Sequence, residues 1–151
     1  MNVTQFLQQQ QIPFEFMSHP DTFDAQHLAA MVHVSGRQVA KTVLVRTGNE
    51  ECYAVVVLPA NRKIQFEPLR MLLQTPTIGM ATEVEMAALC ADCEVGALLP
   101  FGSHYGLPTV IDESLYEFEE MVFEGNTHHE SIRMKMDDFR RLEQPLVGAF
   151  T

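Results

Sequence analysis

Residues 42–59 read TVLVRTGNEECYAVVVLP, and this stretch decides the fold class of the chain. Two runs of β-branched and apolar residues, Thr42–Arg46 and Tyr53–Leu58, flank a polar segment around Gly48, which predicts a β-hairpin. The second run is apolar at nearly every position, as is typical of a strand buried on both faces. Pro59 ends this run, because proline cannot continue a central strand.

Short helices and further strands are predicted on both sides of this hairpin. Capping residues and a 3.6-residue apolar spacing indicate the helices, and β-rich or alternating runs indicate the strands. The expected helices cover residues 2–11, 22–36, 66–74, 82–90 and 137–144, and the expected strands cover residues 14–17, 77–80, 109–112, 120–124 and 131–136. The last two strands form a second hairpin, whose alternation predicts one face toward solvent. The mixture predicts a single α+β domain over residues 1–151, with a mixed sheet curled or closed around the core.

Charge and composition exclude several classes of protein. The formal net charge is −10, with 20 acidic and 10 basic residues, so broad binding to duplex nucleic acid is not expected. Contact with one nucleic-acid end through a few local cations stays open. No apolar run approaches the about 18 residues of a membrane-spanning helix, and residues 1–11 do not resemble a signal peptide. We expect a cytoplasmic protein without a membrane partner, and its oligomeric state stays open.

The cysteines suggest an alternative function as a metal or redox protein. Cys90 and Cys93 form a lone CxxC, and a structural zinc site would need a second pair, which His128 and His129 match poorly in spacing. A redox CxxC would follow a strand and open a helix, whereas this one ends a helical pattern. We therefore expect no metal and no cofactor.

A loop rich in glycine and proline follows the second of these cysteines. Residues 93–108 hold Gly96-x-x-x-Pro100 and then Phe101-Gly102, which fix a stiff, tightly turned backbone. Such a turn can present main-chain N–H groups to an anion or to a carbonyl oxygen. A plain connecting loop is the alternative.

Lys41 is the cation that would complete such a site. It lies where the break at Gly36 gives way to the first long β-run, among apolar or small neighbours. A cation at the lip of a sheet can hold a phosphate as a point charge. An ordinary surface lysine is the alternative.

The chain resembles the YbaK/EbsC family of aminoacyl-tRNA deacylases, which are related to the editing insertion of bacterial prolyl-tRNA synthetases. The resemblance rests on several short motifs that occur in the family's order along nearly the whole chain. These are Val39–Val45, Val57–Ala60, Gly96-x-x-x-Pro100-Phe-Gly102, Leu107-Pro108 with Asp112-x-x-Leu115, and Ile132-x-Met134 with Asp138-Phe139.

The resemblance implies a mixed β-barrel-like sheet surrounded by short helices, and hydrolysis of the ester that joins a wrong amino acid to a tRNA 3′ end. The family's lysine falls on Lys41 and its loop on Gly96 to Pro100. Family members are not known to need a metal, and they clear different small amino acids. The expected partner is the acceptor end of an aminoacyl-tRNA, which a free-standing enzyme would edit in trans.

The expected site combines two catalytic positions with several substrate contacts. Lys41 would anchor a phosphate and the Gly96 loop would stabilise the oxyanion, so no protein nucleophile is required. The predicted substrate contacts are Met31, Pro100, Phe101, Gly102, Ser103, His104 and His129. Phe101 and Met31 can equally belong to the core. A non-catalytic tRNA- or partner-binding module of the same fold is the alternative to an enzyme.

Overall fold

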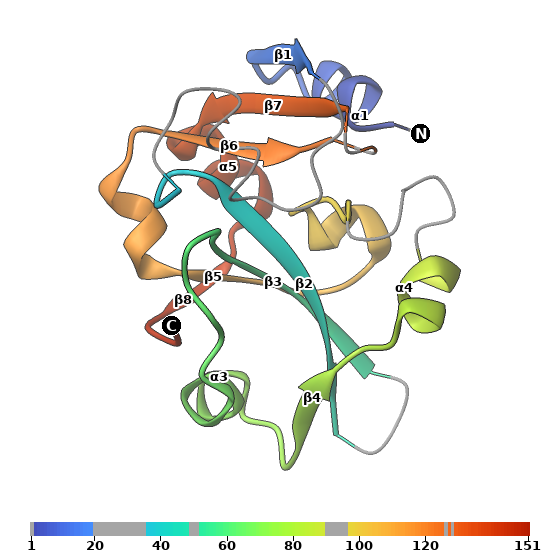
Figure 1. Cartoon of the computed structure of the whole chain (residues 1–151), viewed down its shortest axis with the longest axis vertical. Coiled ribbons are helices and arrows are strands. Elements are labelled where there is room, and N and C mark those ends of the chain that lie inside the picture. Colours follow the sequence, from blue (N-terminus) through green and yellow to red (C-terminus); the bar gives the residue numbers. More distant parts are fainter. Residues whose placement is uncertain (1, 20–35, 49–51, 90–96, 126, 128) are drawn as a thin grey trace.

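The computed structural model describes residues 2–19, 36–48, 52–89, 97–125, 127 and 129–151. Figure 1 shows a small sheet at the top and a long hairpin that runs down from it. The five-stranded sheet has the order β4 (Ile78–Met80), β2 (Ala40–Thr47), β3 (Cys52–Pro59), β5 (Thr109–Asp112) and β8 (Leu146–Gly148). The three-stranded sheet has the order β1 (Phe14–Ser18), β7 (Glu130–Lys135) and β6 (Glu120–Glu124).

The β2–β3 hairpin is the centre of the larger sheet, as its sequence predicts. The two strands pair antiparallel from Ala40 opposite Pro59 to Thr47 opposite Cys52. Strand β3 also pairs with β5 in parallel, with Val57 opposite Ile111. Because β3 has a neighbour on each side and packing on each face, its residues Val55–Leu58 are fully buried.

One β-bridge is described between the two sheets. Val39, just before β2, forms a parallel bridge with Val122 of β6, and the Val122 N–H donates to the Gln38 carbonyl at 3.5 Å. The β6–β7 hairpin is confirmed, with Phe123 opposite Ile132. The α+β prediction is therefore confirmed, with the strands divided between two joined sheets.

Most of the apolar core fills the space enclosed by the two sheets. Phe101 lies in its middle and is fully buried. Its ring centroid lies 5.2 Å from that of Phe6, 5.5 Å from that of Phe123 and 5.7 Å from that of Phe139. A second apolar cluster packs on the opposite face of the larger sheet. It contains Val56 and Leu58 of β3 together with Phe150.

Four α-helices and two 3₁₀ helices are described around the sheets. They are α1 (Val3–Gln9), α3 (Phe66–Leu73), α4 (Glu83–Leu89), α5 (Met136–Glu143), η1 (Gly102–Tyr105) and η2 (Glu113–Glu117). Side chains satisfy the first backbone N–H groups of two helices, because Asn2 bonds the Gln5 N–H at 2.9 Å and Thr82 bonds the Glu85 N–H at 3.1 Å. No described helix is long and apolar enough to span a membrane.

Some elements differ from the sequence-based predictions. Strand β8 and both 3₁₀ helices were not predicted, and α5 begins at Met136, where the expected strand 131–136 was to end. The expected helix over residues 22–36 lies outside the described residues, apart from Gly36. One face of β7 was predicted to point to solvent. Lys135 on that face is exposed, but Ser131 on the same face is fully buried.

Candidate functional site

Lys41 is the second residue of β2 and lies opposite Leu58 of β3. Side chains alternate along a strand. Ala40 and Leu44 belong to the core between the sheets, and Val43 packs against the second cluster. Lys41 therefore lies on the face of β2 that points away from the main core, and it is partly exposed.

The neighbouring sheet continues this outer face. On β6, Met121 and Phe123 belong to the main core, so Glu124 lies on the opposite face. The start of β2 lies beside β6 (Figure 1), where Val39 bridges Val122. Lys41 and Glu124, each two residues beyond its bridge residue, therefore lie on neighbouring strands. This arrangement joins residues that are more than 80 positions apart in the sequence.

The outer face of β7 carries two buried polar atoms without partners. Ser131 lies opposite Glu124 in the β6–β7 register, and its side chain is fully buried. Neither its Oγ nor the Nε of Arg133, two residues further along the same face, has a hydrogen-bond partner in the described part of the chain. Two strand spacings separate β2 from β7, which is about 10 Å. Unsatisfied buried groups are rare in folded proteins, and a functional role is one of the explanations for such a group.

His129 lies at the beginning of this same face. Its carbonyl accepts a hydrogen bond from the His19 N–H at 2.9 Å, and its own N–H donates to Thr127 Oγ1 at 3.2 Å. These bonds hold His129 where β7 starts beside the end of β1. The exposed residue is two positions from Ser131, so the structure brings a predicted substrate contact close to a residue that the sequence analysis missed.

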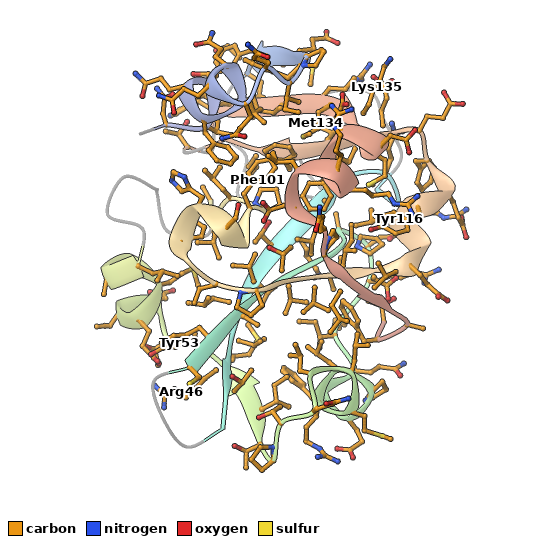
Figure 2. The ribbon with its side chains drawn as sticks, turned by 180° about the vertical axis from the view of Figure 1, so that it is seen from behind. Arg46, Tyr53, Phe101, Tyr116, Met134 and Lys135 are labelled. Carbon is orange, nitrogen blue, oxygen red and sulfur yellow. The ribbon has the colours of Figure 1, made fainter. Side chains whose placement is uncertain are left out.

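The loop after Gly96 is buried where it is described. Leu98, Leu99 and Phe101 pack in the core between the sheets, and Ala97 is buried beside them in the sequence. Figure 2 shows Phe101 in the interior. Of the two roles left open for Phe101, pocket wall or core, the structure places its side chain in the core. Pro100 is buried as well.

The first main-chain N–H groups of the 3₁₀ turn η1 donate hydrogen bonds to other groups of the protein. The Gly102 N–H donates to Thr109 Oγ1 at 2.8 Å, and the Ser103 N–H donates to Glu143 Oε1 at 3.1 Å. The His104 N–H donates to the Phe101 carbonyl at 3.0 Å. The predicted substrate contacts at Gly102, Ser103 and His104 therefore have other partners through their backbone.

The same turn also holds the loop that precedes it. Tyr105 Oη accepts a hydrogen bond from the Leu99 N–H at 3.1 Å, and burial raises the pKa of the Tyr105 phenol to about 12. The His104 ring packs edge-on against Tyr105 at a centroid distance of 5.1 Å. Since the amides of Leu99 and Gly102 are bonded internally, an oxyanion would have to be bound by other amides of the loop.

Several predicted site residues lie outside the described residues. They are Met31, Cys90, Cys93, Gly96 and His128. The apolar part of the Gly96 loop packs on the core face of β2, whereas Lys41 lies on the outer face. Gly96 itself lies outside the described residues, so its convergence with Lys41 is a proposal. In the described portion of the chain, no three His, Cys, Asp or Glu side chains are grouped to hold a metal ion.

A charged cluster anchors the helix that leads to the Gly96 loop. Glu85 of α4 accepts hydrogen bonds from Arg46 Nε at 3.1 Å and from the Tyr53 hydroxyl, residues that lie side by side in Figure 2. The bonds from Arg46, Tyr53 and the Thr82 N–H lower the pKa of Glu85 to about 2. Since α4 has no fully buried residue among those described, this cluster holds the helix against the sheet together with the half-buried Met86 and Leu89.

Comparison with known sequences and structures identifies the class of protein. The sequence model of the aminoacyl-tRNA editing domain matches residues 19–142. This match covers most of the chain, which therefore belongs to the aminoacyl-tRNA editing domain family. The resemblance predicted from the sequence is confirmed, and so is deacylation of aminoacyl-tRNA as the activity of that family.

Individual relatives agree with this assignment. The multifunctional Ser/Thr-tRNA deacylase ProXp-y of Escherichia coli K12 is 24% identical over 147 residues, which cover 95% of this chain and 87% of the relative. The crystal structure of the protein APE2540 superposes with a TM-score of 0.87 at 17% identity, over 98% of this chain and 97% of the other. A proposed trans-editing enzyme for prolyl-tRNA synthetase superposes with a TM-score of 0.81 at 20% identity, over 91% and 86%. At these identities the structural matches show the fold.

Proposed function

We propose that residues 1–151 act as one free-standing editing domain in the cytoplasm, which hydrolyses the ester of a small mischarged amino acid on the 3′ end of a tRNA. The observation that carries this proposal is the position of Lys41. A cation lies beside the described β-bridge between the two sheets, on the same outer face as a buried Ser131 hydroxyl that has no described partner. A positive charge and a hydroxyl thus lie on one face of a protein with a net charge of −10.

The chemistry requires little from the protein. An aminoacyl ester is already activated, so a positioned water can attack the carbonyl carbon without a covalent enzyme intermediate. Negative charge then develops on the carbonyl oxygen, and main-chain N–H groups near Gly96 would stabilise it. Lys41 would hold the phosphate next to the terminal adenosine as a point charge. The expelled group is the ribose hydroxyl, which takes the proton that the water loses.

The amino acid is proposed to lie against the outer face of β7. The Ser131 hydroxyl and His129 would contact it, together with Met31 from outside the described residues. A small pocket excludes large side chains but discriminates one methylene by only about 1–3 kcal/mol. We therefore expect measurable hydrolysis of more than one small aminoacyl ester. Because the E. coli relative is a Ser/Thr-tRNA deacylase, seryl- and threonyl-tRNA belong in the test panel.

The test is a panel of alanyl-, cysteinyl-, prolyl-, seryl- and threonyl-tRNA incubated with the protein and with the variant Lys41→Ala. We expect loss of at least one ester with the wild type, and a loss of rate of about tenfold or more with Lys41→Ala. Lys63→Ala is the matched control, because Lys63 is exposed and lies beyond the end of β3. It should hydrolyse the same esters at the wild-type rate.

Three outcomes would count against the proposal. Wild-type rates with folded Lys41→Ala would remove the lysine from the site. Equal losses in Lys41→Ala and Lys63→Ala would indicate a general effect of surface charge. Binding of tRNA without loss of any ester would indicate a non-catalytic binding module of the same fold.

A further inference from the structure

The structure assigns to Glu143 the role of a positioning residue, which fixes the Ala97–Gly102 segment for deacylation through the turn η1. This inference rests on the proposed function. Glu143 is the last residue of α5, and it lies 40 residues from Ser103 and 34 residues from Thr109 in the sequence. Its carboxylate nevertheless bonds both of these residues, so it joins three separate elements at one point.

Three donors converge on the two carboxylate oxygens. The Ser103 N–H donates to Oε1 at 3.1 Å, the Thr109 hydroxyl donates to Oε1 at 2.8 Å, and the Ser103 hydroxyl donates to Oε2. The Thr109 oxygen in turn accepts the Gly102 N–H at 2.8 Å. The bonds therefore form a continuous chain from α5 through β5 into the first residues of η1.

The place of Glu143 in its own helix favours a role outside that helix. A negative charge at a helix C-terminus is unfavourable because the last carbonyl groups point there, and the favoured charge is positive. Arg140 and Arg141 supply such charges in the last turn of α5. Glu143 opposes the helix dipole, and its three hydrogen bonds run to the η1 region instead.

The turn that Glu143 holds has no spare room. A Cβ at Gly102 would lie 2.4 Å from Thr109 Oγ1 and 2.6 Å from the Leu107 carbonyl oxygen. The backbone of the turn is thus closed directly onto Thr109, whose side chain is only 6% exposed. A shift of Thr109 or Ser103 would therefore move the backbone at Gly102.

Such a shift would reach the proposed oxyanion donors through a short, fixed path. Tyr105 belongs to the same turn, and its hydroxyl holds the Leu99 N–H at 3.1 Å. Both ends of the segment from Leu99 to Gly102 are therefore fixed by η1. The amides before Leu99 begin directly where this segment ends, so Glu143 sets their position without contacting the substrate.

The experiment compares Glu143→Ala and Glu143→Gln with the wild type on the aminoacyl-tRNA that the protein hydrolyses fastest. We expect Glu143→Ala to lower kcat by about tenfold to a hundredfold, because small displacements of catalytic groups have effects of this size. KM should stay within about threefold of the wild type, since the substrate contacts remain. Glu143→Gln keeps one acceptor oxygen and should recover part of the lost kcat.

The matched control is Glu67→Ala, which removes an exposed carboxylate that is ion-paired with Arg70 on α3, far from the loop. Its kcat should equal that of the wild type. Hydrogen exchange of peptides covering residues 97–103 is measured on all variants. We expect faster exchange there in Glu143→Ala, with wild-type exchange in β2 and β3.

Two results would overturn the inference: an unchanged kcat in folded Glu143→Ala, or a loss of kcat that only follows the loss of folded protein. If the wild type hydrolyses no ester on the panel, the proposed function fails and the role of Glu143 in deacylation fails with it. The hydrogen-exchange measurement then still decides whether Glu143 fixes the loop, and unchanged exchange at residues 97–103 would remove that part too.

Discussion

The turn η1 and the outer face of β7 differ in how their polar groups are hydrogen-bonded. The N–H groups of Gly102 and Ser103 in the turn, and that of Leu99 just before it, all donate to side chains of the protein itself. On the outer face of β7, the Ser131 hydroxyl is fully buried and has no partner among the described residues. A closed network specifies structure, whereas an open one has capacity left for a ligand.

This difference changes where the chemistry is expected. The glycine- and proline-rich loop was the most conspicuous motif of the sequence, but its described part is mainly a scaffold. The outer face near Lys41 has no conspicuous motif, because its residues come from β2 and from the β6–β7 hairpin, which lie far apart in the chain. The proposed catalytic contribution of the loop therefore excludes the amides of Leu99, Gly102 and Ser103.

The largest expected effect concerns Phe101, which tests whether the loop is scaffold or pocket. We expect Phe101→Ala to lower the free energy of unfolding by about 3–5 kcal/mol, because the removed ring leaves a cavity among Phe6, Phe123 and Phe139. Urea denaturation measures this change. Phe16→Ala is the control, since Phe16 is 46% exposed and should lose less than about 1 kcal/mol. A stable Phe101→Ala with lost activity would instead make Phe101 a pocket wall.

How much of this arrangement is readable from sequence depends on how local its causes are. The hairpin of β2 and β3 was predicted correctly because its two apolar runs and its turn are adjacent in the chain. The capping boxes of α1 and α4 were readable for the same reason, as each closes within four residues. Strand β8 was missed because its three residues form a strand only by pairing with β5.

The site shows the same limit more strongly. The position of Lys41 at the beginning of a strand was predicted from the sequence, because a long β-run starts there. Its nearness to Glu124 depends on a bridge between two sheets. The alternation of Ile132 and Met134 with Arg133 was visible and correctly separated the two faces of β7. The burial of Ser131 was not visible, because it depends on what covers that face. The closure of η1 by Glu143 joins residues 40 positions apart, which no local pattern encodes.

A smaller expected effect on the free energy of unfolding distinguishes a hydrogen-bonded buried hydroxyl from one without a described partner. Thr109→Val removes a buried hydroxyl that both accepts and donates, so we expect a loss of about 1–2 kcal/mol in the free energy of unfolding. Ser131→Ala removes a buried hydroxyl without a described partner, and we expect a change within about 0.5 kcal/mol. Deacylation by Ser131→Ala should nevertheless change. Equal destabilisation by the two substitutions would mean that Ser131 is part of the scaffold as well.

The smallest expected effect concerns the charged cluster around Glu85 of α4. Like the polar groups of η1, the Glu85 carboxylate is hydrogen-bonded within the protein, and it also forms an ion pair with Arg46. The pKa of Glu85 is lowered from 4.5 to about 2 by Arg46, Tyr53 and Thr82. A carboxylate with a lowered folded-state pKa stabilises the fold fully above its unfolded pKa, and this contribution disappears as the pH falls through the folded value. Thermal unfolding between about pH 4.5 and pH 2 should therefore show a steeper loss of stability in the wild type than in Glu85→Gln. Glu83→Gln, an exposed neighbour in the first turn of the same helix, should keep the wild-type slope, whereas equal slopes in all three proteins would show that the cluster does not anchor α4.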